Sequence, residues 1–158
     1  MPAETRSLPL SSPAETCALA ERLAPRLGPG DVLLLSGGVG AGKTHFARCL
    51  IQSLLPVPED VPSPTYTLVQ TYPGPAAEIW HADLYRLSDP AEIVELGLSE
   101  AFEGAIVLVE WPDRLGTLTP ENALSLELVP GAGDGARLLS LRWSDPRWSD
   151  RLKGIVDG

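Results

Sequence analysis

Short apolar runs and helical stripes alternate along the chain. Residues 31–36, Asp-Val-Leu-Leu-Leu-Ser, and residues 105–109, Ala-Ile-Val-Leu-Val, have the length and composition of buried strands. After the first run, residues 45–55 place apolar side chains at helical spacing, namely Phe46, Leu50, Ile51 and Leu54. This alternation of strand and helix predicts an α/β fold.

The rest of the chain supplies elements on either side of this centre. A first strand is expected over residues 6–10 and a helix from Pro13, with Ser12 as N-cap and Glu15 completing a capping box. Further strands are expected at 67–72, 77–82, 124–129 and 137–143, and further helices at 89–96, 98–102 and 145–156. We therefore predict one domain over residues 1–158, a three-layer sandwich whose central, mostly parallel sheet has some antiparallel strands at one side.

The charge balance argues against direct contact with nucleic acid. The chain has 12 Lys and Arg against 21 Asp and Glu, a formal net charge of −9, and its only lysines are Lys43 and Lys153. A protein that binds nucleic acid usually carries a basic stripe, so we expect any role in RNA metabolism to act through a partner. The apolar runs are too short to span a membrane, and residues 1–6 do not resemble a signal peptide, so we expect a cytoplasmic protein.

The cysteines and histidines do not indicate a metal centre. Cys17 and Cys49 both fall inside expected helices and lack metal-ligand spacing, so we expect two small buried hydrophobic residues. The only histidines, His45 and His81, are too few to form a zinc cluster with them.

The most specific motif lies between the first buried strand and the helix after it. Residues 37–44 fit G-x-x-x-x-G-K-[ST], the phosphate-binding P-loop. The order strand, loop, helix is the one that aims backbone N–H groups and a helix N-terminus at phosphate. The expected nucleotide-binding residues are Gly37, Gly38, Val39, Gly40, Ala41, Gly42, Lys43 and Thr44. Lys43 would reach the outer phosphates, and the Thr44 hydroxyl would bind Mg²⁺.

Two carboxylates follow expected strands, where ligands of such sheets gather. Glu110 comes directly after residues 105–109, at a position like that of a Walker B carboxylate, although Asp is more usual there. Asp83 could help to bind Mg²⁺, position the attacking water, or cap a turn. His81 lies on the same face as Asp83, and a lone histidine in such a place is more often structural.

Four further residues are candidates by position. Thr65 ends a proline-rich loop, where it could contact Mg²⁺ or the γ-phosphate, or simply form a turn. Trp111, after Glu110, could be core or a docking surface. Arg86 and Arg114 are the basic residues nearest the site in sequence, and either could serve as an arginine finger, although most such arginines form surface pairs.

Four segments occur in an order that resembles the bacterial TsaE (YjeE) family. They are residues 37–44, Ser-Pro-Thr-Tyr at 63–66, His-Ala-Asp-Leu-Tyr-Arg at 81–86 and Val-Glu-Trp-Pro at 109–112. The resemblance covers residues 10 to 145. It departs from the family pattern at Gly38, where Asp is common, and at His45, where a second Thr is common.

The resemblance implies a small ATPase needed for the threonylcarbamoyladenosine modification of tRNAs that read codons starting with A. Such proteins act with TsaD and TsaB, of which TsaD performs the transfer to tRNA. It implies that Lys43 and the loop bind ATP, and that Thr44 and Glu110 bind Mg²⁺ with Asp83 in or beside that shell. It also implies a switch role for Thr65 and importance for Trp111.

Other P-loop classes remain open from the residues alone. A small-molecule or nucleotide kinase usually has an arginine-rich lid, and no segment clusters arginines in that way. A GTPase would fit D-x-x-G at 113–116 but usually reads guanine with N-K-x-D, whereas the only asparagine is Asn122, followed by Ala123. A P-loop protein that binds nucleotide without hydrolysing it is the remaining alternative.

Overall fold

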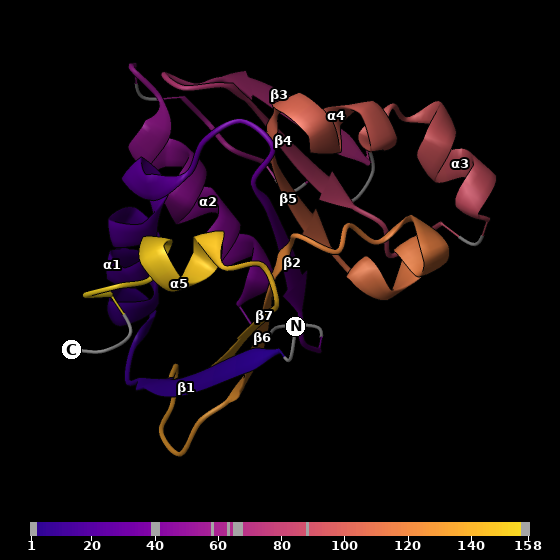
Figure 1. Ribbon diagram of the computed structural model, residues 1–158. Helices are drawn as coiled ribbons and strands as arrows, with labels where there is room; N and C mark the ends of the chain where they lie inside the picture. The colour runs from indigo at the N-terminus through magenta and orange to yellow at the C-terminus, as the bar shows by residue number, and fades with distance from the viewer. Residues whose placement is uncertain are drawn as a thin grey trace.

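One seven-stranded sheet forms the centre of the computed structural model, which describes residues 3–38, 42–57, 59–62, 64, 68–87 and 89–155 (Figure 1). Its strand order is β1-β7-β6-β2-β5-β4-β3. The strands are β1 Glu4–Leu10, β2 Val32–Ser36, β3 Val69–Pro73, β4 Glu78–Asp83, β5 Ile106–Glu110, β6 Leu124–Pro130 and β7 Arg137–Trp143. Five of these seven run in one direction, and β3 and β7 oppose them. The expected mostly parallel sheet is confirmed.

The predicted position of the antiparallel strands is wrong in one respect, because β3 and β7 lie on opposite sides of the parallel centre of the sheet. The β3–β4 hairpin has its turn at residues 74–77, and its strand β4 pairs with β5. The β6–β7 hairpin has its turn at residues 131–136, and its strand β6 pairs with β2. Short connections of this kind can join only antiparallel neighbours. Since β5 and β2 lie at the centre of the sheet, the two hairpins extend it in opposite directions.

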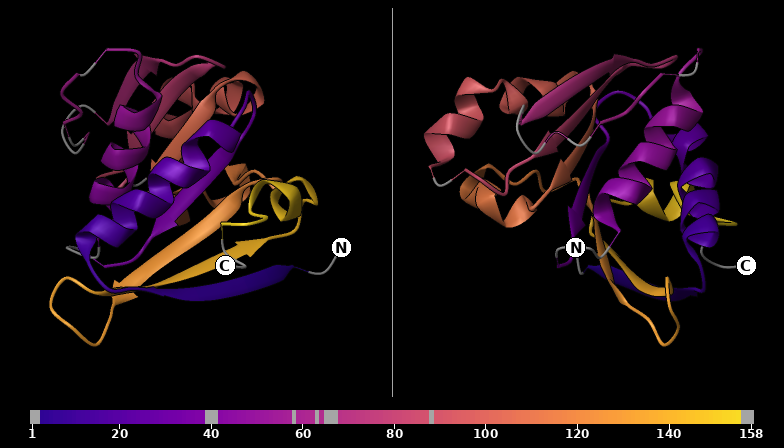
Figure 2. Two further views of the ribbon diagram at one scale, coloured as in Figure 1. Left: turned by 90° about the vertical axis from the view of Figure 1, so that its left-hand side faces the viewer. Right: turned by 180° about the vertical axis from the view of Figure 1, so that it is seen from behind.

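Helices cover both faces of the sheet and so make the three layers (Figures 1 and 2). One face carries α1 Pro13–Leu23 with the 3-10 turn η1 Ala24–Arg26, α2 Lys43–Leu54 and α5 Arg147–Arg151. The other face carries α3 Pro90–Glu95, α4 Leu98–Gly104 and the 3-10 segment η2 Pro112–Leu118. The expected last helix over 145–156 is thus shorter than predicted, and the helix after the loop begins two residues earlier.

The continuous apolar runs of β2 and β5 reflect burial on both faces. Leu33 and Leu35 of β2 pack in the core that contains α1 and α2, whereas Val32 and Leu34 pack in the core that contains α3 and α4. Successive side chains of a strand point to opposite faces, so a strand between two helical layers needs an apolar residue at each position. This packing fixes the carboxyl end of β2, where the loop starts.

The start of α1 agrees with prediction except for one contact. The Ser12 hydroxyl accepts a hydrogen bond from the Glu15 backbone N–H at 3.2 Å, as an N-cap does. The Glu15 carboxylate accepts from the Ser11 backbone N–H at 2.9 Å, one residue before the position that a capping box requires. The carboxylate thus secures the chain that enters the helix from β1, and the Ser11 bonds lower the pKa of Glu15.

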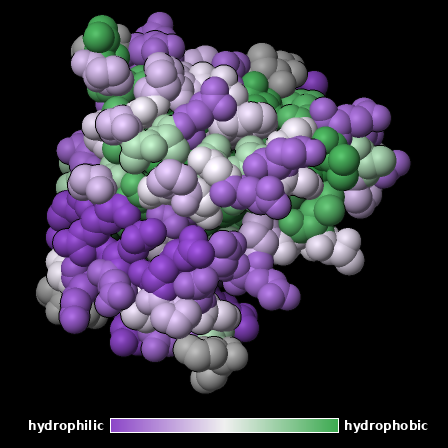
Figure 3. Space-filling view, turned by 45° about the horizontal axis from the view of Figure 1, so that its top comes forward, coloured by the Kyte–Doolittle hydropathy of each residue, from purple (hydrophilic) through white to green (hydrophobic). Residues whose placement is uncertain are grey.

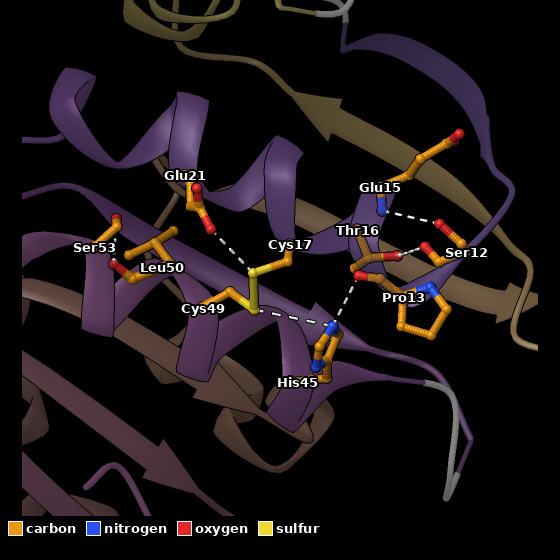
Figure 4. The surroundings of a disulfide bond; sticks show 10 residues. All are labelled: Ser12, Pro13, Glu15, Thr16, Cys17, Glu21, His45, Cys49, Leu50 and Ser53. Atoms are coloured by element: carbon orange, nitrogen blue, oxygen red, sulfur yellow. Dashed lines mark hydrogen bonds between the residues drawn. A yellow bond between two sulfur atoms is a disulfide. The ribbon is translucent and has the colours of Figure 1, made fainter. Parts of the chain in front are cut away.

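The two cysteines form a disulfide that joins α1 to α2 (Figure 4). Their Cα atoms are 5.3 Å apart, and Cys49 is buried while Cys17 is half-buried. The expectation of two small buried hydrophobic residues is therefore wrong in its chemistry, because the two helices that carry the cysteines pack side by side and bring the sulfur atoms together. His45 lies next to the bridge in Figure 4, with Nε2 2.9 Å from the carbonyl oxygen of Pro13.

A buried carboxylate anchors α5 at the amino end of β2. Asp31 is fully buried and accepts hydrogen bonds from the Gly28 N–H at 2.8 Å, from Arg147 Nη1 at 3.2 Å and from Arg151 Nε at 2.9 Å. Two cations and a backbone donor compensate a charge that is costly to bury alone. This cluster lies at the end of β2 opposite the P-loop.

Few large apolar side chains are exposed on the described surface. The most exposed are Val57, Tyr85, Val94 and Leu138. In the view of Figure 3, hydrophilic residues cover a broad area on the side where α1 and α5 lie, and smaller apolar groups occur on the side of α3. Among the described residues no helix is long and apolar enough to cross a membrane.

Candidate active site

The loop between β2 and α2 places its ends at the carboxyl edge of the sheet. Gly42 adopts φ 102°, a left-handed conformation that suits glycine, and α2 begins at the next residue. Gly37 also has positive φ, 135°. Of the predicted phosphate-binding residues, Val39, Gly40 and Ala41 lie outside the described residues.

Lys43 points back over the start of the loop. Its Nζ donates hydrogen bonds to the carbonyl oxygens of Gly37 at 2.7 Å and Gly38 at 2.9 Å, and only 5% of the residue is exposed. Burial lowers the pKa of Lys43, and the nearby carboxylates of Glu110 and Asp83 act in the opposite direction. The ammonium is thus held at the loop by neutral acceptors that an anion with stronger charge can replace.

Two carboxylates end neighbouring strands. Asp83 of β4 and Glu110 of β5 are register partners, and both side chains are buried. The hydroxyl of Thr44, the second residue of α2, donates a hydrogen bond to Oε1 of Glu110 at 2.8 Å. Asp83 Oδ1 accepts from the Tyr85 backbone N–H at 3.0 Å, which orients it at the start of the turn after β4. The structure therefore brings together Lys43, Thr44, Glu110 and Asp83.

Sequence reasoning missed the contact of His81 with this group. The ring is fully buried, and its Nε2 lies 2.7 Å from Oε2 of Glu110. One sequence signal pointed this way, because His81 lies two residues before Asp83 and hence on the same face of its strand. The register of β4 against β5, which brings His81 within reach of Glu110, came only from the structure.

Trp111 turns over the loop immediately after Glu110. It has the left-handed backbone angles φ 59° and ψ 55°, which are uncommon for a bulky residue, and its N–H donates to the Leu35 carbonyl oxygen at 3.3 Å. Its half-buried ring lies 4.8 Å from that of Tyr85, measured between centroids. The second docking candidate, Arg86, directly follows Tyr85 in sequence and is exposed. Its backbone is therefore close to this aromatic pair.

The remaining candidates are Thr65 and Arg114. Thr65 lies outside the described residues, although its flanks are tied to the site: the Leu68 N–H donates to the Pro64 carbonyl oxygen at 2.7 Å, and the Asp83 N–H donates to the Leu68 carbonyl oxygen at 2.8 Å. Arg114 is exposed within η2, and its N–H donates to the Trp111 carbonyl oxygen at 3.3 Å.

The donor set fits magnesium better than a softer metal. Thr44, Glu110 and Asp83 offer hydroxyl and carboxylate oxygens, which Mg²⁺ prefers, and Mg²⁺ usually takes few protein ligands beside water and phosphate. Within the described parts of the chain, no group of three or more His, Cys, Asp or Glu side chains is placed to hold a metal alone.

Comparison with known proteins agrees with this arrangement. The sequence model of the family described as threonylcarbamoyl adenosine biosynthesis protein TsaE matches residues 10–137. The chain is similar to the tRNA threonylcarbamoyladenosine biosynthesis protein TsaE of Rickettsia bellii, with 41% identity over 119 residues, 75% of this chain and 83% of the relative. It is also similar to the protein of that name from Bacillus subtilis, with 38% identity over 127 residues, 80% of this chain and 78% of the relative.

A solved structure shares the whole architecture. The crystal structure of YdiB from Bacillus subtilis superposes with a TM-score of 0.81 and 27% sequence identity, covering 98% of this chain and 96% of that one. The match supports the P-loop NTPase-like assignment of the sheet, loop and helices. With the family model matching most of its length, this chain belongs to the TsaE family of threonylcarbamoyl adenosine biosynthesis proteins.

Proposed function

We propose that this protein is an Mg²⁺-dependent ATPase that serves the threonylcarbamoyladenosine modification of tRNAs reading codons that start with A. In this proposal it acts on a partner complex of TsaD-like and TsaB-like proteins and does not bind tRNA itself. Membership of the TsaE family supports the modification, because the relatives are named for tRNA threonylcarbamoyladenosine biosynthesis. The expected cytoplasmic location belongs to the same proposal.

One observation carries the ATPase part. The Thr44 hydroxyl is 2.8 Å from Glu110 at the start of the helix whose first residue is Lys43. A phosphate-binding lysine, a hydroxyl and a carboxylate therefore converge from α2 and β5 at one edge of the sheet. This is the set of groups that P-loop enzymes use to bind the phosphates and the metal of a nucleoside triphosphate.

The chain's own residues then have separate tasks. The loop N–H groups and Lys43 would bind the phosphates, and Lys43 would exchange its bonds to Gly37 and Gly38 for phosphate oxygens. Thr44, Glu110 and Asp83 would hold Mg²⁺, which when bound neutralises charge on the phosphates. Whichever of Glu110 and Asp83 is less engaged there would orient the water that attacks the γ-phosphorus as the bond to the ADP oxygen breaks.

The need for partners follows from charge and exposure. The formal net charge of −9 opposes contact with a phosphate backbone. The aromatic pair of Trp111 and Tyr85, which the exposed Arg86 follows in sequence, would provide a docking surface next to the nucleotide site. A partner that covers this surface would exclude water from the site and raise the rate.

The test is phosphate release from ATP by the purified chain, with and without TsaD-like and TsaB-like proteins from the same organism, at saturating Mg²⁺. We expect slow release alone and faster release with the partners, none of it in the presence of a chelator. Transfer of the γ-phosphate to a metabolite would instead identify a kinase. Nucleotide binding without turnover, even with both partners, would leave a binding module and contradict the ATPase proposal.

A further inference from the structure

His81 is a buried polar residue to which the proposed reaction assigns no role so far. It lies in β4 opposite Leu108 of β5, and none of its surface is exposed. Its Nε2 is 2.7 Å from Oε2 of Glu110, while Oε1 of the same carboxylate accepts from Thr44 at 2.8 Å. Each oxygen of Glu110 is therefore engaged by a donor from a different element.

The position of the ring hydrogen follows from its surroundings. An ionised carboxylate can only accept, so the hydrogen between the two residues lies on Nε2 of His81. Nδ1 is buried and has no hydrogen-bond partner in the described part of the chain. Among the described residues no acceptor faces Nδ1, so a hydrogen there would be buried and unpaired, and the geometry favours the Nε2–H tautomer.

The bare Nδ1 argues against a purely space-filling role. An unpaired buried nitrogen lowers the stability of a protein. If His81 only filled space, an apolar residue of similar size would fill it without that cost. Among the described residues, the bond to Glu110 is the one polar contact of the ring, and an apolar residue cannot make it.

We propose that His81 is a positioning residue that keeps the Glu110 carboxylate turned toward Thr44 and the loop. The inference rests on the proposed ATPase function for its consequence, but its geometry can be tested separately. Glutamate has one more rotatable bond than the aspartate that is usual at this position, so a second anchor is needed to define where its oxygens lie. Groups that orient a metal-binding carboxylate in this way affect metal affinity and rate without touching the substrate.

The first test measures the histidine tautomers directly by long-range ¹H–¹⁵N NMR of the rings. The chain has two histidines, so a His45→Gln variant assigns both signals. We expect the Nε2–H tautomer at His81 with a slowly exchanging proton, and loss of that proton signal in Glu110→Ala. An Nδ1–H tautomer in the parent protein would overturn the proposal. So would a His81 proton signal that is unchanged in Glu110→Ala.

The second test compares His81→Gln with His81→Leu. The amide nitrogen of Gln can take the place of Nε2, whereas Leu fills the space without a donor. We expect His81→Leu to lower kcat with saturating partners by about 10- to 100-fold and to raise the Mg²⁺ concentration needed for tight ATP binding, the usual result of losing an outer-shell hydrogen bond. Nucleotide affinity without Mg²⁺ should stay near the parental value, and His81→Gln should recover most of both losses.

The outcomes separate this inference from the proposed function. Equal defects in the Gln and Leu variants at equal melting temperature, or a parental Mg²⁺ requirement in His81→Leu, would show that His81 only packs. If the parent protein itself hydrolyses no ATP with its partners, the proposed function fails. The Mg²⁺ dependence of nucleotide binding and the tautomer of His81 would then still decide whether the ring orients Glu110.

Discussion

The ammonium of Lys43 lies 4.2 Å from the centroid of the Trp111 ring. The two residues are far apart in sequence, and the left-handed backbone of Trp111 brings its ring back over the loop. A cation above an aromatic face is stabilised by about 0.5–2 kcal/mol, depending on its exposure to water. Lys43 is thus held by the ring and by two loop carbonyls, and a phosphate group must compete with these contacts.

We expect Lys43→Ala to lower ATP affinity about 10- to 100-fold, because charge-assisted hydrogen bonds contribute about 1.5–3 kcal/mol each. The fold should persist, because Ala is compatible with the first turn of α2. Titration of a fluorescent ATP analogue measures the loss. Lys153→Ala removes the other, exposed lysine and is the matched control. If the parent and Lys43→Ala bound the ATP analogue with equal affinity, the assignment of Lys43 as a phosphate-binding residue would be wrong.

We expect Glu110→Gln and Asp83→Asn to reduce hydrolysis much more than nucleotide affinity. A carboxylate that holds Mg²⁺ or orients water acts mainly in the transition state, and loss of such a group typically costs about 100-fold or more in rate. Phosphate release with partners present and analogue titration give the two quantities. Glu121→Gln, an exposed carboxylate in a turn, is the control. Parental rates in both site variants would contradict the assignment.

The isolated protein should bind tRNA only weakly at physiological salt. The formal net charge of −9 repels the phosphate backbone, and adding salt should weaken the residual binding further. A filter-binding titration at two salt concentrations measures both effects. Tight, sequence-selective binding by the chain alone would favour an enzyme that acts on RNA without partners.

Reduction of the Cys17–Cys49 disulfide should destabilise the fold. The bridge closes a loop with a sequence separation of 32, for which the chain-entropy account gives about 3–4 kcal/mol. The melting midpoint should fall by roughly 10 °C when a reductant is added. The Cys17→Ala, Cys49→Ala double variant is the control, since a reductant should not change its midpoint. A parent protein equally insensitive to reductant would show that the bridge contributes nothing.

The buried Asp31 should depend on its two arginines. Replacing both Arg147 and Arg151 with Ala would leave a fully buried carboxylate with one backbone donor, which should cost about 2–4 kcal/mol once the partial exposure of the arginines is considered. Urea unfolding measures this, with the exposed Arg142→Ala as control. Adding Asp31→Leu should restore part of the loss. A double variant as stable as the parent would show that water compensates Asp31.

Local patterns were enough to predict the strands of this fold. Apolar runs and turn residues predicted the seven strands to within about two residues, since each signal lies inside its own segment. The placement of antiparallel strands on both sides of the parallel centre was missed, because strand order depends on contacts between segments that are distant in sequence. The same limit hid the disulfide, which requires α1 and α2 to pack side by side.

The candidate site divides in the same way. The motif around Lys43 and the strand-end positions of Glu110 and Asp83 are features of neighbouring residues, and the structure brings them together. The contact of His81 with Glu110 depends on the register between β4 and β5, which alternation of residue type does not determine. The turn of Trp111 depends on a left-handed backbone that its sequence neighbours do not signal.

The first and last strands of the chain are neighbours in the sheet. Glu4 faces Trp143 and Leu10 faces Arg137, and β1, at the sheet edge, pairs with β7 alone. The ribosome makes β1 long before β7, so during synthesis β1 has no partner in this sheet until β7 has emerged. We therefore expect the complete sheet to form only after β7 has left the ribosome, with the nascent chain exposing an unpaired strand to chaperones until then.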